Sequence, residues 1–87
     1  MEQEACMEQR IAILGIIVEN EDSVERVNEL LHEYRDYIVG RMGMPYRERK
    51  ISVISIVLDA GNDVVSALSG KLGMLEGVSA KAVYSKK

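Results

Sequence analysis

Two short segments are apolar on both of their alternating faces, and this pattern limits the fold more than any other. They cover residues 10–19 (RIAILGIIVE) and 50–59 (KISVISIVLD), and both are rich in β-branched side chains. Runs this short are typical of strands rather than of buried helices. A strand that is apolar on both sides must be covered on both faces of its sheet. The sequence therefore predicts two central strands that need cover from above and from below.

An amphipathic helix is expected after each of these strands. The first is predicted over about residues 22–36, with Asp22 as its N-cap and Glu25 completing a capping box. The second begins near the turn Gly61-Asn62-Asp63 and stops near Gly73, because glycine favours the backbone conformation that ends helices. The two apolar stripes are Val24, Val27, Leu30, Leu31 and Tyr34, and then Val64, Val65, Leu68, Leu72 and Leu75.

Two further strands complete the order. Residues 37–44 predict a strand that bends or bulges near Gly40 and Gly43, followed by a polar loop over residues 45–50. Pro45 lacks an N–H, so this strand should lie at an edge of the sheet or end there. Residues 78–85 alternate as a last strand. The order β-α-β-β-α-β with right-handed crossovers predicts an α+β, ferredoxin-like sandwich with sheet order 4-1-3-2 and both helices on one face.

This fold leaves one apolar sheet face without cover. The helices shield only one side, yet both central strands are apolar on both sides. The uncovered side chains would form a larger patch than a soluble monomer normally exposes. A second copy of the chain is the simplest cover. We therefore expect a homodimer or homotetramer that forms through the uncovered sheet face.

Length and composition indicate a single domain. The chain has 87 residues and is 47% hydrophobic, which suits one small core and excludes a disordered chain. We expect a flexible acidic leader over residues 1–9 and one domain over residues 10–87. The longest apolar run is far shorter than a membrane helix, and the leader carries acids where a signal peptide needs positive charge. A cytoplasmic protein without membrane contact is expected.

Few residues offer reactive chemistry. His32 is the single histidine and Cys6 the single cysteine, so neither a catalytic triad nor a spacing typical of metal ligands is present. The acids Glu19, Glu21 and Asp22 are interpreted as capping the first helix and balancing its dipole. The sequence predicts no catalytic residue, no metal site and no cofactor.

Charge is distributed unevenly along the chain. Residues 1–34 carry nine acids and two bases (net −7), whereas residues 35–50 carry five bases and two acids (net +3). Arginines interleaved with tyrosines can bind an anion, or form an assembly surface. We favour self-association over nucleic-acid binding, since the whole chain has a net charge of −3 and no direct DNA contact is expected. Arg41, Tyr46 and Arg47 are the candidate ligand-binding residues.

The central run of the chain resembles a known family. Residues 40–48 (GRMGMPYRE), followed by the strand ISVISIVLDA, resemble the signature of the iron-only hydrogenase system regulator family. The resemblance covers about residues 9–86. That family is similar to ACT-type regulatory domains and to the C-terminal domain of the nickel-responsive repressor. The resemblance implies a ferredoxin-like fold, homo-oligomers and a regulatory role beside iron-only hydrogenase, without catalytic activity. Nickel is not implied, because this chain lacks the several histidines of the repressor.

Three functions remain open at this point. The leading hypothesis is a non-enzymatic regulatory module that senses a small molecule or a regulatory protein, with an effector site between subunits near Arg41, Tyr46 and Arg47. The second is an assembly subunit without a ligand. The third is an acylphosphatase-like hydrolase, which would need an arginine in a phosphate-binding loop after the first strand. Here that loop is acidic (Glu19-Asn20-Glu21-Asp22), which disfavours hydrolysis.

Overall fold

The computed structural model describes residues 9–86 and has the expected order of elements. Its elements are β1 (Gln9–Val18), the short 3-10 helix η1 (Glu21–Ser23), α2 (Val24–Glu33), a second 3-10 helix η2 (Arg35–Tyr37), β2 (Ile38–Tyr46), β3 (Ile51–Gly61), α3 (Asn62–Gly73) and β4 (Val78–Tyr84). The leader expected over residues 1–9 lies outside the described residues except for Gln9, which opens β1. None of the helices in residues 9–86 has the length and apolar character that a membrane crossing requires.

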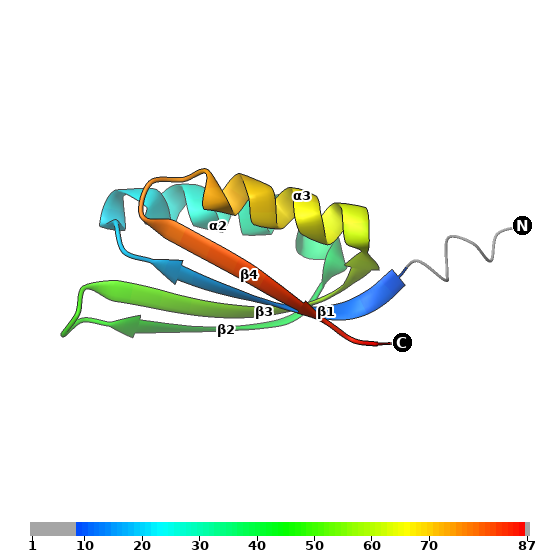
Figure 1. Ribbon diagram of the computed structural model, residues 1–87. Helices are drawn as coiled ribbons and strands as arrows, with labels where there is room; N and C mark the ends of the chain where they lie inside the picture. The colour runs from blue at the N-terminus through cyan, green and yellow to red at the C-terminus, as the bar shows by residue number, and fades with distance from the viewer. Residues whose placement is uncertain (1–8, 87) are drawn as a thin grey trace, which may run out of the picture.

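The four strands form one antiparallel sheet, and the two helices lie together on one of its faces (Figure 1). The strand order β2-β3-β1-β4 is the predicted order 4-1-3-2 read from the other edge. This is a ferredoxin-like α+β fold. The two strands that the sequence marks as apolar on both faces, β1 and β3, form the central pair.

The pairing of β1 with β3 divides their side chains between two surfaces. Leu14 stands opposite Ile56 and Ile16 opposite Ile54, and all four face the helices and are buried. The helices complete this core with Val27, Leu30 and Leu31 from α2, and with Val65, Leu68 and Leu72 from α3. The alternate residues of β1 point the other way and are exposed. We call that side of the sheet the open face.

A bulge at the start of β2 decides which of its residues reach the open face. Ile38 pairs with Leu58, but Gly40 pairs with Val57, so the register shifts by one residue between them. The bulge predicted near Gly40 is confirmed, whereas the pairing runs in unbroken register past Gly43, the second glycine named in that prediction. A one-residue shift sends every later side chain to the opposite face. Consequently Arg41, Gly43 and Pro45 share the helix side with Ile56, Ile54 and Ser52, whereas Met42, Met44 and Tyr46 share the open face with Ser55, Val53 and Ile51.

Three element ends differ from the prediction. The N-cap is Asn20 rather than Asp22, since the Asn20 Oδ1 accepts a hydrogen bond of 2.9 Å from the Asp22 N–H. The predicted helix over residues 22–36 is broken into η1, α2 and η2. Strand β2 continues through Pro45 to Tyr46, which an edge strand allows because its outward side needs no N–H donor.

The loop after β1 is fixed against the connection that precedes β4. The Glu19 N–H donates to the Gly77 carbonyl at 2.7 Å, and the buried Ser23 hydroxyl donates to the Glu76 carbonyl at 2.7 Å. Gly77 has a φ of +74°, and a Cβ added there would lie 2.7 Å from the Cβ of Asn20. Only glycine fits this crossing without strain.

We expect Gly77→Ala to destabilise the fold by at least about 1–3 kcal/mol, because alanine must adopt a left-handed conformation and displace Asn20. Gly70→Ala is the matched control, since Gly70 lies within α3 with no atom near its added Cβ. That control should stabilise the chain by about 0.5–1 kcal/mol. Urea unfolding of both variants measures the difference, and equal stabilities would contradict this role of Gly77.

Candidate functional site

A groove runs between α2 and the edge strand β2 on the helix side of the sheet. It consists of two adjoining hollows of about 190 and 210 Å³, which share Val18, Val24, Pro45 and Ser52. We call it the α2–β2 groove. It exists because the helices leave β2 uncovered, so that every residue of β2 is exposed or half-buried.

The larger part of its lining is apolar. Val24 and Val27 of α2 form one wall, Ile54 of β3 lies on the floor, and Gly43 and Pro45 belong to the β2 side. A Cβ built on Gly43 would meet no atom within 4 Å. Neither packing nor a positive φ requires glycine there, since Gly77 is the glycine with positive φ among the described residues. The absent side chain simply leaves the groove open.

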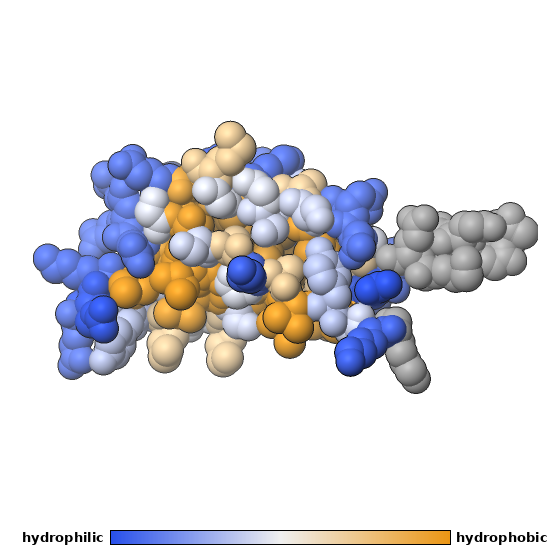
Figure 2. Space-filling model, in the orientation of Figure 1, coloured by the Kyte–Doolittle hydropathy of each residue, from blue (hydrophilic) through white to orange (hydrophobic). Residues whose placement is uncertain are grey.

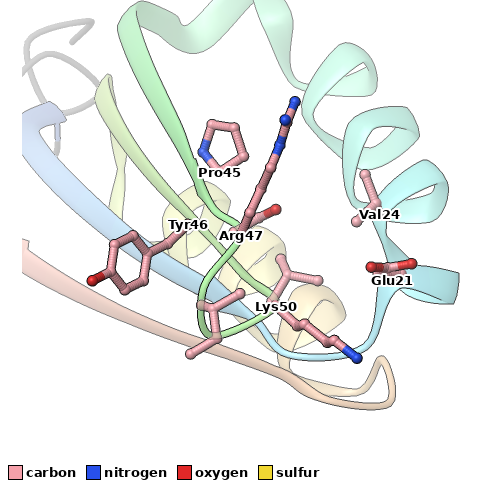
Figure 3. A pocket seen from close by; sticks show the side chains of 9 residues that line it. Glu21, Val24, Pro45, Tyr46, Arg47 and Lys50 are labelled. Atoms are coloured by element: carbon pink, nitrogen blue, oxygen red, sulfur yellow. The ribbon is translucent and has the colours of Figure 1, made fainter.

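Cationic side chains line both hollows of the groove. Arg41 lines one hollow, and its Nη2 donates to the Oδ1 of Asn28 on α2 at 3.3 Å. Arg47 and Lys50, from the turn between β2 and β3, line the other hollow, together with the single acid Glu21 (Figure 3).

These three cations have no acidic partner within salt-bridge distance in the described part of the chain. The ion pairs found there join Arg26 to Glu29 and Glu33 on the outer face of α2. Arg41 meets a neutral amide instead. The groove therefore combines an apolar floor with positive charge that nearby carboxylates do not neutralise.

The structure divides the three residues expected to form a ligand site. Arg41 and Arg47 line neighbouring parts of the α2–β2 groove, and the Arg47 side chain extends along it in Figure 3. The Tyr46 ring points away from α2 in the same view, consistent with its register position on the open face. Tyr46 thus borders the groove, but its ring points toward the other surface.

The remaining tyrosines of the basic stretch lie at the far end of β2. The rings of Tyr34 and Tyr37 are 6.2 Å apart, and the Lys71 Nζ of α3 lies 5.1 Å from the Tyr34 ring centroid. Hydrogen bonding to Tyr34 raises the pKa of the Lys71 ammonium above its usual value. This cluster follows the end of α2, while Arg47 follows the end of β2. The tyrosines and arginines do not form one continuous stacking platform.

The loop after β1 offers carboxylates in place of a phosphate cradle. Glu19, Glu21 and Asp22 are all exposed there, and negative charge at this position would repel a phosphate. His32 is exposed on α2 beside Glu29 and Glu33. Among residues 9–86, no three His, Cys, Asp or Glu side chains come together in a way that could hold a metal ion.

Comparison with known proteins identifies the family. Residues 10–82 match the model of the TM1266-like family, whose description is "Iron-only hydrogenase system regulator, putative". The chain belongs to this family. The match spans β1 to within β4, so it includes the groove and most of the open face described above.

Two solved structures place the chain among its neighbours. It is similar to TM1266, an uncharacterised protein from Thermotoga maritima, with a TM-score of 0.87 and 45% identity over 91% of this chain and 100% of that one. It also resembles part of a formyltetrahydrofolate deformylase from Pseudomonas putida, with a TM-score of 0.64 and 14% identity over 88% of this chain and 29% of the deformylase. The second likeness concerns the fold alone. A search of the curated proteins gave no match.

Sequence reasoning did not find the groove residues outside the basic stretch. Asn28 lies one helical turn after Val24, so the two share a face of α2, and this spacing was the available signal. Ser52 had no such signal, because only its register opposite Pro45 places it in the groove.

Two double-mutant cycles test on which side of the sheet the Arg41 side chain lies. Arg41→Ala and Asn28→Ala should couple by about 0.5–1 kcal/mol, since each removes the same hydrogen bond. Arg41→Ala and Tyr46→Ala are the control pair and should add without coupling, because their side chains lie on opposite sides of the sheet. Unfolding free energies at one protein concentration measure both cycles. Equal coupling in the two cycles would contradict the described register.

Proposed function

We propose that this protein is a non-enzymatic regulator within the iron-only hydrogenase system and acts as an oligomer whose copies join through the open face. In this proposal the α2–β2 groove receives a small effector. Family membership supports the regulatory role. The observation that carries the oligomer is the apolar open face.

The open face exposes large apolar side chains from all four strands. They are Ile11, Ile13, Ile17, Met42, Met44, Tyr46, Val53 and Val83. Their exposed fractions run from 36% to 70%, and they lie on four neighbouring strands of one sheet. Soluble monomers rarely expose a contiguous apolar patch of more than a few hundred Å². Figure 2 shows apolar surface along the side of the molecule opposite the helices.

The open face is hollowed beside Gly15 of β1, which carries no side chain. Gly15 pairs with Ser55 of β3 on one side and with Lys81 of β4 on the other, so the exposed Lys81 side chain lies on the same face, toward the β4 edge. The rows on either side carry Ile13 and Ile17. Glycine in a central strand weakens the strand unless another backbone or side chain needs the space. A second copy of the chain would use it.

The groove supports a binding role better than a catalytic one. Its polar groups are arginine, lysine, serine and an amide, with Glu21 as the one acid among them. The acidic loop after β1 argues against the acylphosphatase-like alternative, which needs an arginine there. A ligand-free assembly subunit differs from this proposal only in the groove, so binding experiments on the groove distinguish them.

We expect Ile13→Glu to reduce the oligomer to single chains, because a carboxylate would be buried without a partner in the centre of the interface. Met74→Glu is the control, since Met74 is 86% exposed and follows α3 on the helix side. Light scattering should give the mass of one chain for Ile13→Glu and an unchanged larger mass for Met74→Glu. A wild-type protein with the mass of one chain would overturn the proposed oligomer.

Gly15→Val tests the close approach without adding charge. The nearest atom to a Cβ at Gly15 is the Lys81 carbonyl oxygen at 3.9 Å, so a single chain accepts the side chain and should gain about 0.5–1 kcal/mol in strand stability. In an oligomer, the valine side chain would fill the hollow beside residue 15 on the open face. We expect light scattering to show that Gly15→Val chains associate more weakly than wild-type chains. Unchanged association would mean that the interface does not include this part of the open face.

The regulatory role is tested in the host that carries the gene. Deletion should change the transcripts of the iron-only hydrogenase genes or the hydrogenase activity per cell, and an Ile13→Glu allele should behave like the deletion. A Met74→Glu allele should behave like the wild type. If the deletion itself changes neither transcripts nor activity, the proposed regulatory role is wrong.

A further inference from the structure

The α2–β2 groove has a chemistry of its own that narrows the class of effector. We propose that it binds a small monocarboxylate with an apolar tail, the carboxylate on Arg41 and Arg47 and the tail over Gly43. This inference rests on the effector-binding part of the proposed function and not on the open face.

The anionic end follows from the state of the arginines. Arg41 bonds to the Oδ1 of Asn28 at 3.3 Å, which is a long hydrogen bond to a neutral acceptor. A carboxylate accepts two parallel hydrogen bonds from a guanidinium and carries the opposite charge, so it would replace the amide with a gain in free energy. Arg47 extends into the same groove from the turn (Figure 3). The site is therefore built for an anion that its own residues do not supply.

The apolar tail follows from the apolar lining beside Arg41. Val24, Val27 and Ile54 line the part of the groove that Arg41 borders. Gly43 opposes Ile54 in the sheet and leaves open space above it. A β-branched residue would suit the strand better than glycine at this position. Glycine at position 43 thus leaves the groove open at some cost in strand stability, as expected if a ligand occupies the space.

Size and charge argue against larger or more highly charged ligands. Each hollow, of about 190 or 210 Å³, is by itself smaller than the usual site of a drug-sized molecule, and the two together reach only the lower part of that range. Glu21 of η1 lines the same hollow as Arg47 and Lys50, and its negative charge would oppose a polyphosphate. One negative charge on a short apolar body fits these limits.

The test is an amide NMR titration of the whole protein with three probes: hexanoate, hexylammonium and acetate. Hexanoate carries both the charge and the tail, hexylammonium has the tail with the opposite charge, and acetate has the charge without the tail. We expect saturable shifts from hexanoate at residues of the α2–β2 groove, and binding at least about tenfold weaker for the other two.

Three variants and one control assign the site. Arg41→Gln and Arg47→Gln should each weaken hexanoate binding about tenfold, because each removes a charge-assisted hydrogen bond. Arg49→Gln is the matched control: Arg49 lies in the same turn but does not line the groove. It should bind hexanoate like the wild type. Gly43→Val should fold normally and lose hexanoate binding, because its side chain fills the space meant for the tail.

Each contrary result overturns the inference. Absence of saturable hexanoate binding removes the ligand class. Equal binding of acetate shows a general anion effect, and equal binding of hexylammonium shows an apolar surface without charge selection. An equal loss of hexanoate affinity in Arg49→Gln and Arg47→Gln would show that the anion responds to the positive charge of the turn as a whole and not to the groove. Light scattering should give these variants the same mass as the wild type, because none of the substitutions lies on the open face. A failure of this inference can therefore be told apart from a failure of the proposed oligomer.

Discussion

The pairing of β1 with β3 is the interaction on which the rest of the molecule depends. Both strands are apolar on both faces, and their antiparallel register gathers one set of side chains under the helices and the other set on the open face. The buried set forms a core with α2 and α3. The other set cannot be covered by the same two helices, because both already lie on one side of the sheet (Figure 1). A fold this small thus creates its own demand for a partner surface.

The bulge at the start of β2 connects the two proposed surfaces. Without the register shift between Ile38 and Gly40, Met42 and Met44 would face the helix side and Arg41 would face the open side. The shift gives the open face two large apolar side chains and gives the groove an arginine. Bulges commonly re-aim side chains near functional sites, and here one irregularity adds apolar side chains to the open face and one cationic side chain to the groove. The groove lies beside α2 because the two helices do not reach the edge strand.

Periodicity in the sequence was sufficient to predict the order of elements and the sheet. The alternation in β1 and β3 and the stripes of α2 and α3 are local patterns, and each belongs to one element. The ends of the first helix were predicted less well, because Asn20 rather than Asp22 accepts the capping hydrogen bond and because the chain tightens into 3-10 turns on both sides of α2. Where the helix begins and ends depends on the hydrogen bonds of a few residues, including the bond that the Ser23 hydroxyl donates to the distant Glu76 carbonyl.

The candidate site was only partly predictable for a related reason. Residue type alone singled out Arg41, Tyr46 and Arg47, but the face on which each side chain lies depends on the register of β2 against β3. One shifted residue separates the Tyr46 ring from the arginines. Asn28 and Ser52 line the groove only because of how α2 and β3 pack against the edge strand, and no local sequence pattern predicts that packing.

The central claim is that a second copy covers the open face, and solvent access to its methyl groups tests this most directly. A soluble paramagnetic agent should relax the methyl groups of Ile11, Ile13, Ile17 and Val83 much less than that of Met74, although a single chain leaves all of them exposed. Strong protection of the open-face methyls in the wild type is the result predicted here. Relaxation of those methyls as strong as that of Met74 would show a bare sheet face and contradict the account.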